Sequence, residues 1–243
     1  MPRIAPPPNS LRGGFTLTEL LITTAILAVL AVLVIPSVTH MTDGAARAGC
    51  VGKLREVHTA LTSYAADNRG FFPPAQNERE DSITWIGTLQ HGGYVPNVSK
   101  TATPSRYPLF CPGSKVRDDD HRANVIYANY GINTRVAGRV RTDASKNTQA
   151  LSAALVASPA KTFLVMDAGA WMVYPSLETA PSGPAFYLPG LPANRGFSWQ
   201  KRYAQDAEVG RHRGNLNVLM VDGHVESLPA RDFRGEEGWD GTL

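Results

Sequence analysis

The chain has 243 residues, of which 19% are charged, and its formal net charge is +3. This length fits one sizeable core with an accessory element, and the weak charge gives no compositional support for nucleic-acid binding. The 22 glycines and 18 prolines indicate a loop-rich domain outside the cytosol.

The first 38 residues divide into a basic leader and an apolar segment. Residues 1–14 carry two arginines, three consecutive prolines and no acid, so they do not continue a helix. Residues 15–38 are apolar apart from Glu19 and several Thr and Ser, and roughly 20 such residues cross a hydrocarbon core. The basic leader predicts a cytoplasmic N-terminus and places everything after residue 38 outside.

Three simpler interpretations of this apolar segment fit less well. A secretory signal peptide has a shorter apolar region and a small-residue cleavage site, whereas Pro36 and Ser37 follow here. A lipoprotein signal needs a cysteine just after the segment, and the next cysteine is Cys50. A plain membrane anchor would not favour an acid at its start.

Residues 39–68 predict an amphipathic continuation of the same helix. Apolar side chains recur there at three- and four-residue steps and give one stripe, and Asn68 and Gly70 mark the helix end. The stripe comprises Cys50 or Val51, Leu54, Val57 or His58, Leu61 and Ala65. Together the two segments predict one helix of about 50 residues, half in lipid and half against a globular domain.

Residues 69–243 predict a globular α+β head. A short helix is expected around Trp85, capped by Asp81 and Ser82, and residues 94–122 are expected to form irregular loop. The predicted strands are 125–130, 162–166, 216–221 and 224–228, the last two joined by a two-residue turn at Asp222-Gly223. A long helix, then loops, then an antiparallel sheet favours α+β over alternating α/β.

The stretch Gly13-Gly14-Phe15-Thr16-Leu17-Thr18-Glu19 resembles the processing and methylation site of type IV pilins and type II secretion pseudopilins. The resemblance implies that an inner-membrane prepilin peptidase cuts between Gly14 and Phe15 and methylates the new amino terminus of Phe15. It also implies that Glu19 meets the amino terminus of a neighbouring subunit in a filament. The basic leader and the long apolar segment supply the context that this motif requires.

The resemblance offers a physical reason for the acid. An ionised carboxylate costs about 2 to 3 kcal/mol or more deep in a bilayer, and less near its surface. The Phe15 amine of the next subunit would offset that cost, so we expect the isolated protomer to be strained and the polymer to be relaxed. The alternative is that Glu19 reaches up to the headgroups.

His212, nine further residues and then Asp222-Gly223 resemble the H-x9-DG segment near the end of a large group of bacterial pseudopilin-like proteins. The stretches LFCPGS and ANYGIN resemble the same group, which implies an architecture more than an activity. As metal ligands, His212 and Asp222 are separated by a strand of about 20 Å. We therefore expect Asp222-Gly223 to form the turn and His212 to hydrogen-bond a loop. Asp222 with His224 is a closer couple but a weak metal candidate.

Cys50 and Cys111 are the two cysteines, and neither belongs to a CxxC pair, so a zinc site is not expected. Two buried thiols and one disulfide both fit the sequence. A disulfide would clip the soluble half of the helix to the Cys111-Pro112 loop, worth about 4 kcal/mol in the entropy model.

No enzymatic constellation is found. Phosphate-binding glycine loops, the G-x-S-x-G elbow and the H-E-x-x-H motif are missing from the sequence. The run Asp118–Asp120 is a weak calcium candidate, because the resemblance to secretion pseudopilins, some of which bind calcium in their globular part, allows it. The full calcium-loop pattern is missing, so a solvated turn is the simpler interpretation and no cofactor is expected. Asp167 follows a buried strand and is expected to cap or hydrogen-bond.

The leading hypothesis is a non-catalytic pseudopilin or pilin-like subunit in the inner membrane, with its head outside. Its expected partners are prepilin peptidase, other copies of itself or related pseudopilins, and the secretion or pilus assembly machinery, with no nucleic acid. The alternative is a membrane-tethered binding protein that does not polymerise. Its support is a set of aromatic residues in the 170–200 excursion: Trp171, Tyr174, Phe186, Tyr187 and Trp199.

Overall fold

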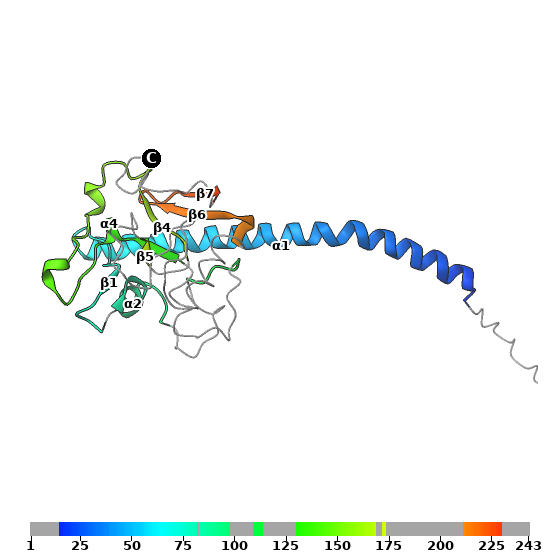
Figure 1. Ribbon diagram of the computed structural model, residues 1–243, viewed down its shortest axis with the longest axis horizontal. Coiled ribbons are helices and arrows are strands. Elements are labelled where there is room, and N and C mark those ends of the chain that lie inside the picture. Colours follow the sequence, from blue (N-terminus) through cyan, green and yellow to red (C-terminus); the bar gives the residue numbers. More distant parts are fainter. Residues whose placement is uncertain are drawn as a thin grey trace, which may run out of the picture. The chain divides into compact units, whose positions relative to one another are not determined.

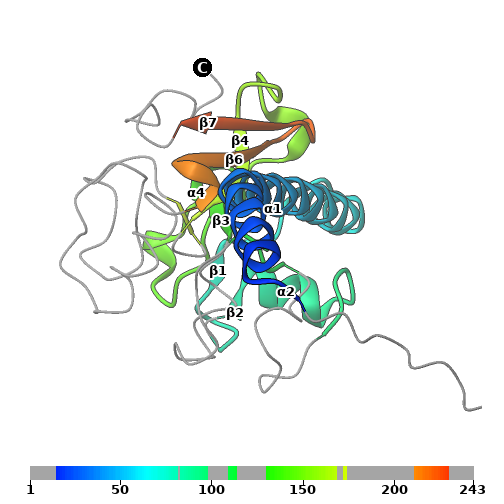
Figure 2. The same cartoon turned by 90° about the vertical axis from the view of Figure 1, so that its right-hand side faces the viewer.

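The computed structural model describes residues 15–81, 83–97, 109–113, 130–168, 172–173 and 211–229 (Figures 1 and 2). The chain divides into two compact units, residues 1–42 and 43–243. The first contains the apolar segment, and the second contains the globular head.

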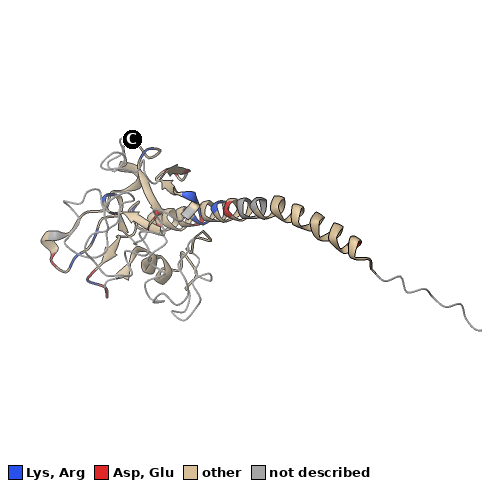
Figure 3. Ribbon diagram, turned by 45° about the vertical axis from the view of Figure 1, so that its right-hand side comes forward, with Lys and Arg blue, Asp and Glu red and all other residues tan. Residues whose placement is uncertain are grey.

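The dominant element is α1, which covers Leu17–Asp67 and has 51 residues. Its first part, Leu17–Ile35, is long and apolar enough to cross a membrane, and none of it is buried within the chain. Figure 3 shows no basic residue along this part, whereas charged residues appear on the later part of α1. The predicted helix of about 50 residues is confirmed, and it continues through Pro36.

The head half of α1 buries one stripe. The buried side chains recur at three- and four-residue steps, as the sequence pattern predicts. They are Cys50, Leu54, Val57, Ala60, Leu61 and Ala65. The chain turns away just after the helix, where Gly70 adopts φ 83° and its N–H donates to the carbonyl of Ala65 at 2.7 Å.

A five-stranded sheet packs on this stripe, in the order β5-β3-β4-β6-β7. The strands are β3 Tyr130–Asn133, β4 Phe163–Asp167, β5 Met172–Val173, β6 Asn215–Met220 and β7 Val225–Pro229. The predicted α+β class is confirmed, and neighbouring strands are antiparallel except for β5, which pairs parallel with β3. The prediction of a purely antiparallel sheet is therefore wrong at the edge formed by β5.

Alternation along β6 builds two apolar clusters. Leu219 joins the cluster that contains the α1 stripe, whereas Leu216, Val218 and Met220 belong to a second cluster. Because side chains alternate across a strand, these two clusters lie on opposite faces of the sheet. The sheet therefore has α1 on one face and is buried on the other as well.

Smaller elements complete the described part of the head. They are β1 Gln76–Asn77, β2 Ile83–Thr84, α2 Trp85–His91, α4 Thr134–Ala137, and the 3-10 turns η2 Ala144–Lys146, η3 Ala153–Leu155 and η5 Arg211–Arg213. The predicted helix around Trp85 is confirmed, but its cap is Thr84, whose hydroxyl accepts the N–H of Gly87 at 3.4 Å. Asp81 cannot take that role because the two-residue strand β2 intervenes.

Candidate functional site

The start of α1 is closed by a capping box between Thr16 and Glu19. The backbone N–H and the hydroxyl of Thr16 donate to Oε2 of Glu19 at 2.9 and 2.8 Å, and the N–H of Glu19 donates to the Thr16 hydroxyl oxygen at 3.2 Å. These reciprocal bonds satisfy backbone donors that a helix start leaves open. The carboxylate therefore has polar partners within one chain, whereas the sequence analysis weighs only its cost in the membrane and its pairing with a neighbouring subunit.

Two threonines of the apolar segment also bond within the helix. The Thr23 hydroxyl donates to the carbonyls of Glu19 and Leu20, and the Thr24 hydroxyl donates to that of Leu21. Hydroxyls bonded in this way are compatible with lipid, where no water satisfies them. Of the two residues at the predicted cleavage point, Phe15 is exposed and Gly14 lies outside the described residues.

A disulfide joins Cys50 on α1 to Cys111 in the segment 109–113. Both residues are fully buried, and their Cα atoms are 4.9 Å apart. The N–H of Gly113 also donates to Sγ of Cys50 at 3.5 Å. The structure thus adopts the disulfide rather than two free thiols, and the bond fastens the Cys-Pro segment to α1.

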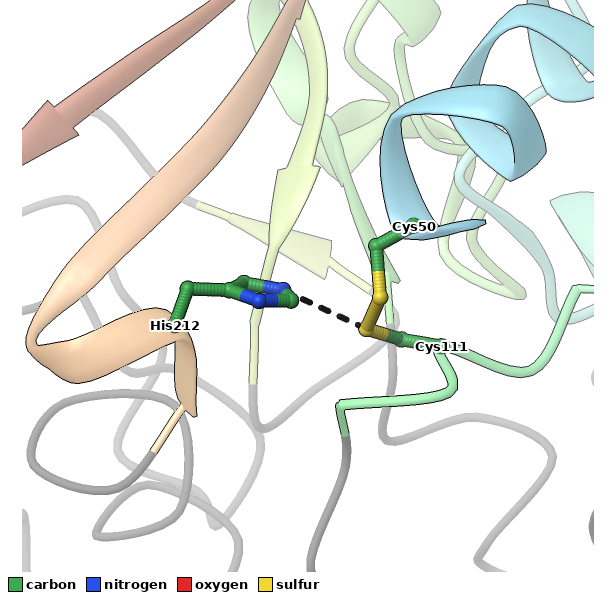
Figure 4. A group of neighbouring side chains, drawn as sticks. All are labelled: Cys50, Cys111 and His212. Carbon is green, nitrogen blue, oxygen red and sulfur yellow. Dashed lines mark hydrogen bonds between the residues drawn. A yellow bond between two sulfur atoms is a disulfide. The ribbon is translucent and has the colours of Figure 1, made fainter. Parts of the chain in front are cut away.

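The ring of His212 points at this disulfide (Figure 4). His212 lies in η5 with φ 48°, in a left-handed conformation that is uncommon for residues other than glycine. Its side chain is 1% exposed, and its Nε2 lies 3.4 Å from Sγ of Cys111 and 3.4 Å from Oδ2 of Asp167. The backbone carbonyl of His212 accepts the side-chain amide of Asn215 at 3.2 Å.

Asp167 is the residue that the sequence analysis did not connect to His212. It ends β4 and is fully buried, and its Oδ2 accepts the backbone N–H of Asn217 on β6 at 2.8 Å. One carboxylate therefore ties two strands together beside the imidazole ring. No local sequence pattern announces this contact, because the pairing of β4 with β6 creates it.

The turn between β6 and β7 has three residues rather than the predicted two. The N–H of Met220 donates to the carbonyl of His224 at 2.9 Å, and the N–H of Gly223 donates to that of Met220 at 3.0 Å. Gly223 has φ 96°, as expected for the left-handed glycine of a three-residue hairpin loop. The extra residue is Val221, whose N–H donates to the carbonyl of Thr162 at 3.0 Å instead of extending the β6–β7 pairing.

Gly223 also lies against α1. A Cβ at this position would be 2.6 Å from Cε1 of His58, whose Nε2 lies 3.3 Å from the carbonyl oxygen of Val221. Both ends of the H-x9-DG segment thus contact groups fixed to α1. His212 contacts the disulfide of Cys50, and Gly223 contacts His58.

Asp222 and Glu226 flank His224 on the exposed hairpin. Its Nδ1 is 2.6 Å from Oδ1 of Asp222, and its Nε2 is 3.2 Å from Oε1 of Glu226. The hydrogen bond with Asp222 raises the pKa of His224 against the opposing effect of burial, and Glu226 adds to the rise. Burial alone would raise the pKa of Asp222. The hydrogen bonds that His224 donates to Asp222, together with the positive charge of His224, outweigh burial and lower the pKa of Asp222. Metal binding by Asp222 and His224 stays a prediction.

Gly223→Ala is expected to destabilise the head by about 2 to 3 kcal/mol. The left-handed backbone accounts for about 1 to 2 kcal/mol, and displacement of the His58 ring accounts for the rest. Gly93→Ala is the matched control, because Gly93 has φ 76° and nothing within 4 Å of an added Cβ. Urea unfolding of the two variants measures the difference, and equal losses would contradict the contact between Gly223 and His58.

Several predicted residues lie outside the described part of the chain. They are Asp118–Asp120, Trp171, Tyr174, Phe186, Tyr187 and Trp199. Calcium binding by Asp118–Asp120 and the membrane-tethered binding protein supported by the aromatic residues therefore stay predictions.

The fold and the N-terminal segment define a membrane-anchored protein with an α+β head, and among the described residues one helix is long and apolar enough to cross a membrane. Residues 9–35 match the family model of the prokaryotic N-terminal methylation motif. The chain is 30% identical over 106 residues to type II secretion system core protein G of Klebsiella pneumoniae, a match that covers 41% of this chain and 75% of that protein. It is 32% identical over 82 residues to competence protein ComGC of Bacillus subtilis, covering 34% of this chain and 72% of that protein.

A third relative is the ComG operon protein 3 homolog of Bacillus licheniformis, 33% identical over 60 residues. That match covers 25% of this chain and 62% of the relative, which is less than two thirds of its length. No solved structure matches the chain. The chain belongs to the type IV pilin-like pseudopilins, and the H-x9-DG resemblance stays a prediction.

Proposed function

We propose that this chain is a structural pilin-like subunit that prepilin peptidase cleaves between Gly14 and Phe15 and methylates on Phe15. The mature chain assembles through residues 15–35 into a periplasmic or surface filament linked to protein secretion. The observation that carries this proposal is the start of α1, where the methylation motif, the Thr16–Glu19 capping box and an apolar segment without buried residues coincide. An exposed apolar surface of this length needs a membrane or other subunits to cover it.

The proposed topology places residues 1–14 in the cytoplasm, 15–38 in the inner membrane, and the helix 39–68 and head 69–243 outside. The two arginines of the leader favour this orientation. The disulfide between Cys50 and Cys111 supports it as well, because disulfides persist in oxidising compartments such as the periplasm.

In this proposal the chain is not an enzyme and binds no nucleic acid, and it needs no cofactor to assemble into the filament. Its partners are prepilin peptidase, copies of itself or related pseudopilins, and the assembly machinery of a secretion system. The named relatives are a type II secretion protein and competence proteins, which supports a role in such a system.

Mass spectrometry of the protein from native membranes tests the processing step. The expected chain begins at N-methylated Phe15. Gly14→Leu is expected to leave the leader uncut, because it puts a bulky side chain directly before the proposed cut, whereas Gly13→Ala is expected to be processed normally. An intact leader on the wild-type chain, in cells with an active prepilin peptidase, would overturn the proposal.

A further inference from the structure

Three residues that can bind zinc converge at one buried point of the head, and the carboxylate of Asp167 lies beside the imidazole among them. The four residues come from four separate segments: Cys50 from α1, Cys111 from residues 109–113, Asp167 from β4 and His212 from η5. All four residues are buried. The Asp167 carboxylate accepts the backbone N–H of Asn217 at 2.8 Å, and the imidazole of His212 lies between this carboxylate and the disulfide.

The distances around the imidazole of His212 fit those between two ligands of one zinc ion. Nε2 of His212 lies 3.4 Å from both Sγ of Cys111 and Oδ2 of Asp167. For nitrogen to oxygen this exceeds the 2.7 to 3.2 Å of an ordinary hydrogen bond. It matches a zinc tetrahedron, whose bond lengths place a nitrogen ligand about 3.5 Å from sulfur and about 3.3 Å from oxygen.

The sulfur atoms of both cysteines lie close to the imidazole of His212. The ligand atoms of Cys50, Cys111 and His212 all lie within 4.8 Å of one another. Two thiolates on one zinc ion are about 3.8 Å apart, so the sulfur atoms must separate once the bond between them is cut. Cysteine and imidazole together are ligands typical of zinc.

We propose that the reduced head binds one zinc ion through Cys50, Cys111, His212 and Asp167, at the place where the oxidised head holds its disulfide. A dithiol reductant converts the disulfide to two thiols and is itself oxidised to a disulfide. Zinc then binds the two thiolates, and the two thiol protons pass to solvent. The oxidised chain has no thiolate to offer and does not bind the ion there.

The two states hold the same parts of the chain together. The disulfide fastens residues 109–113 to α1, and the zinc ion fastens the same segment together with β4 and η5. A head that has not yet been oxidised thus has a second way to fix this segment. The site does not depend on filament assembly, because all four ligands belong to the head.

Cobalt binding to the full-length chain in detergent tests the proposal, because cobalt(II) reports tetrahedral thiolate coordination through its visible absorption and its sulfur-to-metal charge-transfer band. After reduction with a phosphine, one cobalt ion per chain is expected with both features, and zinc is expected to displace it. The oxidised chain is expected to show neither feature. A reduced wild-type chain without the tetrahedral spectrum would overturn the proposal without any variant.

Variants then identify the ligands. His212→Gln and Asp167→Asn are each expected to weaken cobalt binding at least about tenfold, and Asp167→Asn keeps an acceptor for the N–H of Asn217. His91→Gln, at the exposed end of α2, is the control and is expected to bind like wild type. Unchanged binding in both the His212 and Asp167 variants, or an equal loss in the His91 variant, would overturn the proposed ligand set.

Discussion

Replacing Cys50 and Cys111 together by alanine is expected to lower the free energy of unfolding of the head by about 4 kcal/mol. The disulfide joins residues 61 positions apart, so cutting it releases a long loop in the unfolded chain. Small domains have only about 5 to 15 kcal/mol of stability in total, so this loss is a large share. The buried Cys-Pro segment is expected to detach from α1 before the sheet unfolds, because the bond fastens it there.

Denaturant unfolding followed by tryptophan fluorescence measures the loss, since Trp85 is fully buried in the main core. A chelator keeps metal ions from replacing the bond. Reductant is expected to destabilise the wild-type chain by the same amount and to leave the double alanine variant unchanged. A loss below about 1 kcal/mol in both experiments would show that the bond does not constrain the unfolded chain as the entropy model requires.

Local periodicity explains why the architecture of the head was predictable. The stripe containing Leu54 and Leu61 follows the helical repeat, and its burial needs no knowledge of the partner surface. Short apolar runs likewise predicted β4 and β6 to within about a residue at each end. In both cases the signal lies in residues that are neighbours along the chain.

The candidate site was less predictable because it depends on pairing between distant segments. Asp167 reaches His212 only because β4 pairs with β6, and the parallel pairing of β5 with β3 likewise leaves no local signal. The prediction of no zinc site considers only CxxC spacing, whereas the ligands of the proposed site each come from a different element.

The capping box at the start of α1 differs from these cases, because its signal was present in the sequence. Thr16 and Glu19 have the spacing of a Thr-x-x-Glu capping box. The prediction for Glu19 considers only its cost in a membrane and its pairing with a neighbouring subunit, so it misses the role of Glu19 as a helix cap. Glu19 is therefore bonded in the single chain and, in the proposed filament, exchanges or shares that bond with an amine.

The two roles of Glu19 predict different effects for different substitutions. Glu19→Gln keeps an acceptor for Thr16 but removes the charge, so α1 is expected to form normally while self-association fails. Losing about 2 to 3 kcal/mol of charge pairing with the Phe15 amine of a neighbour weakens each contact about 30- to 150-fold. Thr16→Ala is the matched control, since it removes the side-chain part of the capping box and keeps the carboxylate.

Crosslinking in native membranes measures the outcome. Wild type and Thr16→Ala are expected to give ladders of oligomers, whereas Glu19→Gln and Glu19→Ala are expected to give protomers, although all four chains reach the membrane. Ladders that persist in both Glu19 variants would mean that the carboxylate serves only as a helix cap. If all four chains, wild type included, give only protomers, the result would instead favour a membrane-tethered binding protein. Such a protein needs the apolar segment only as an anchor.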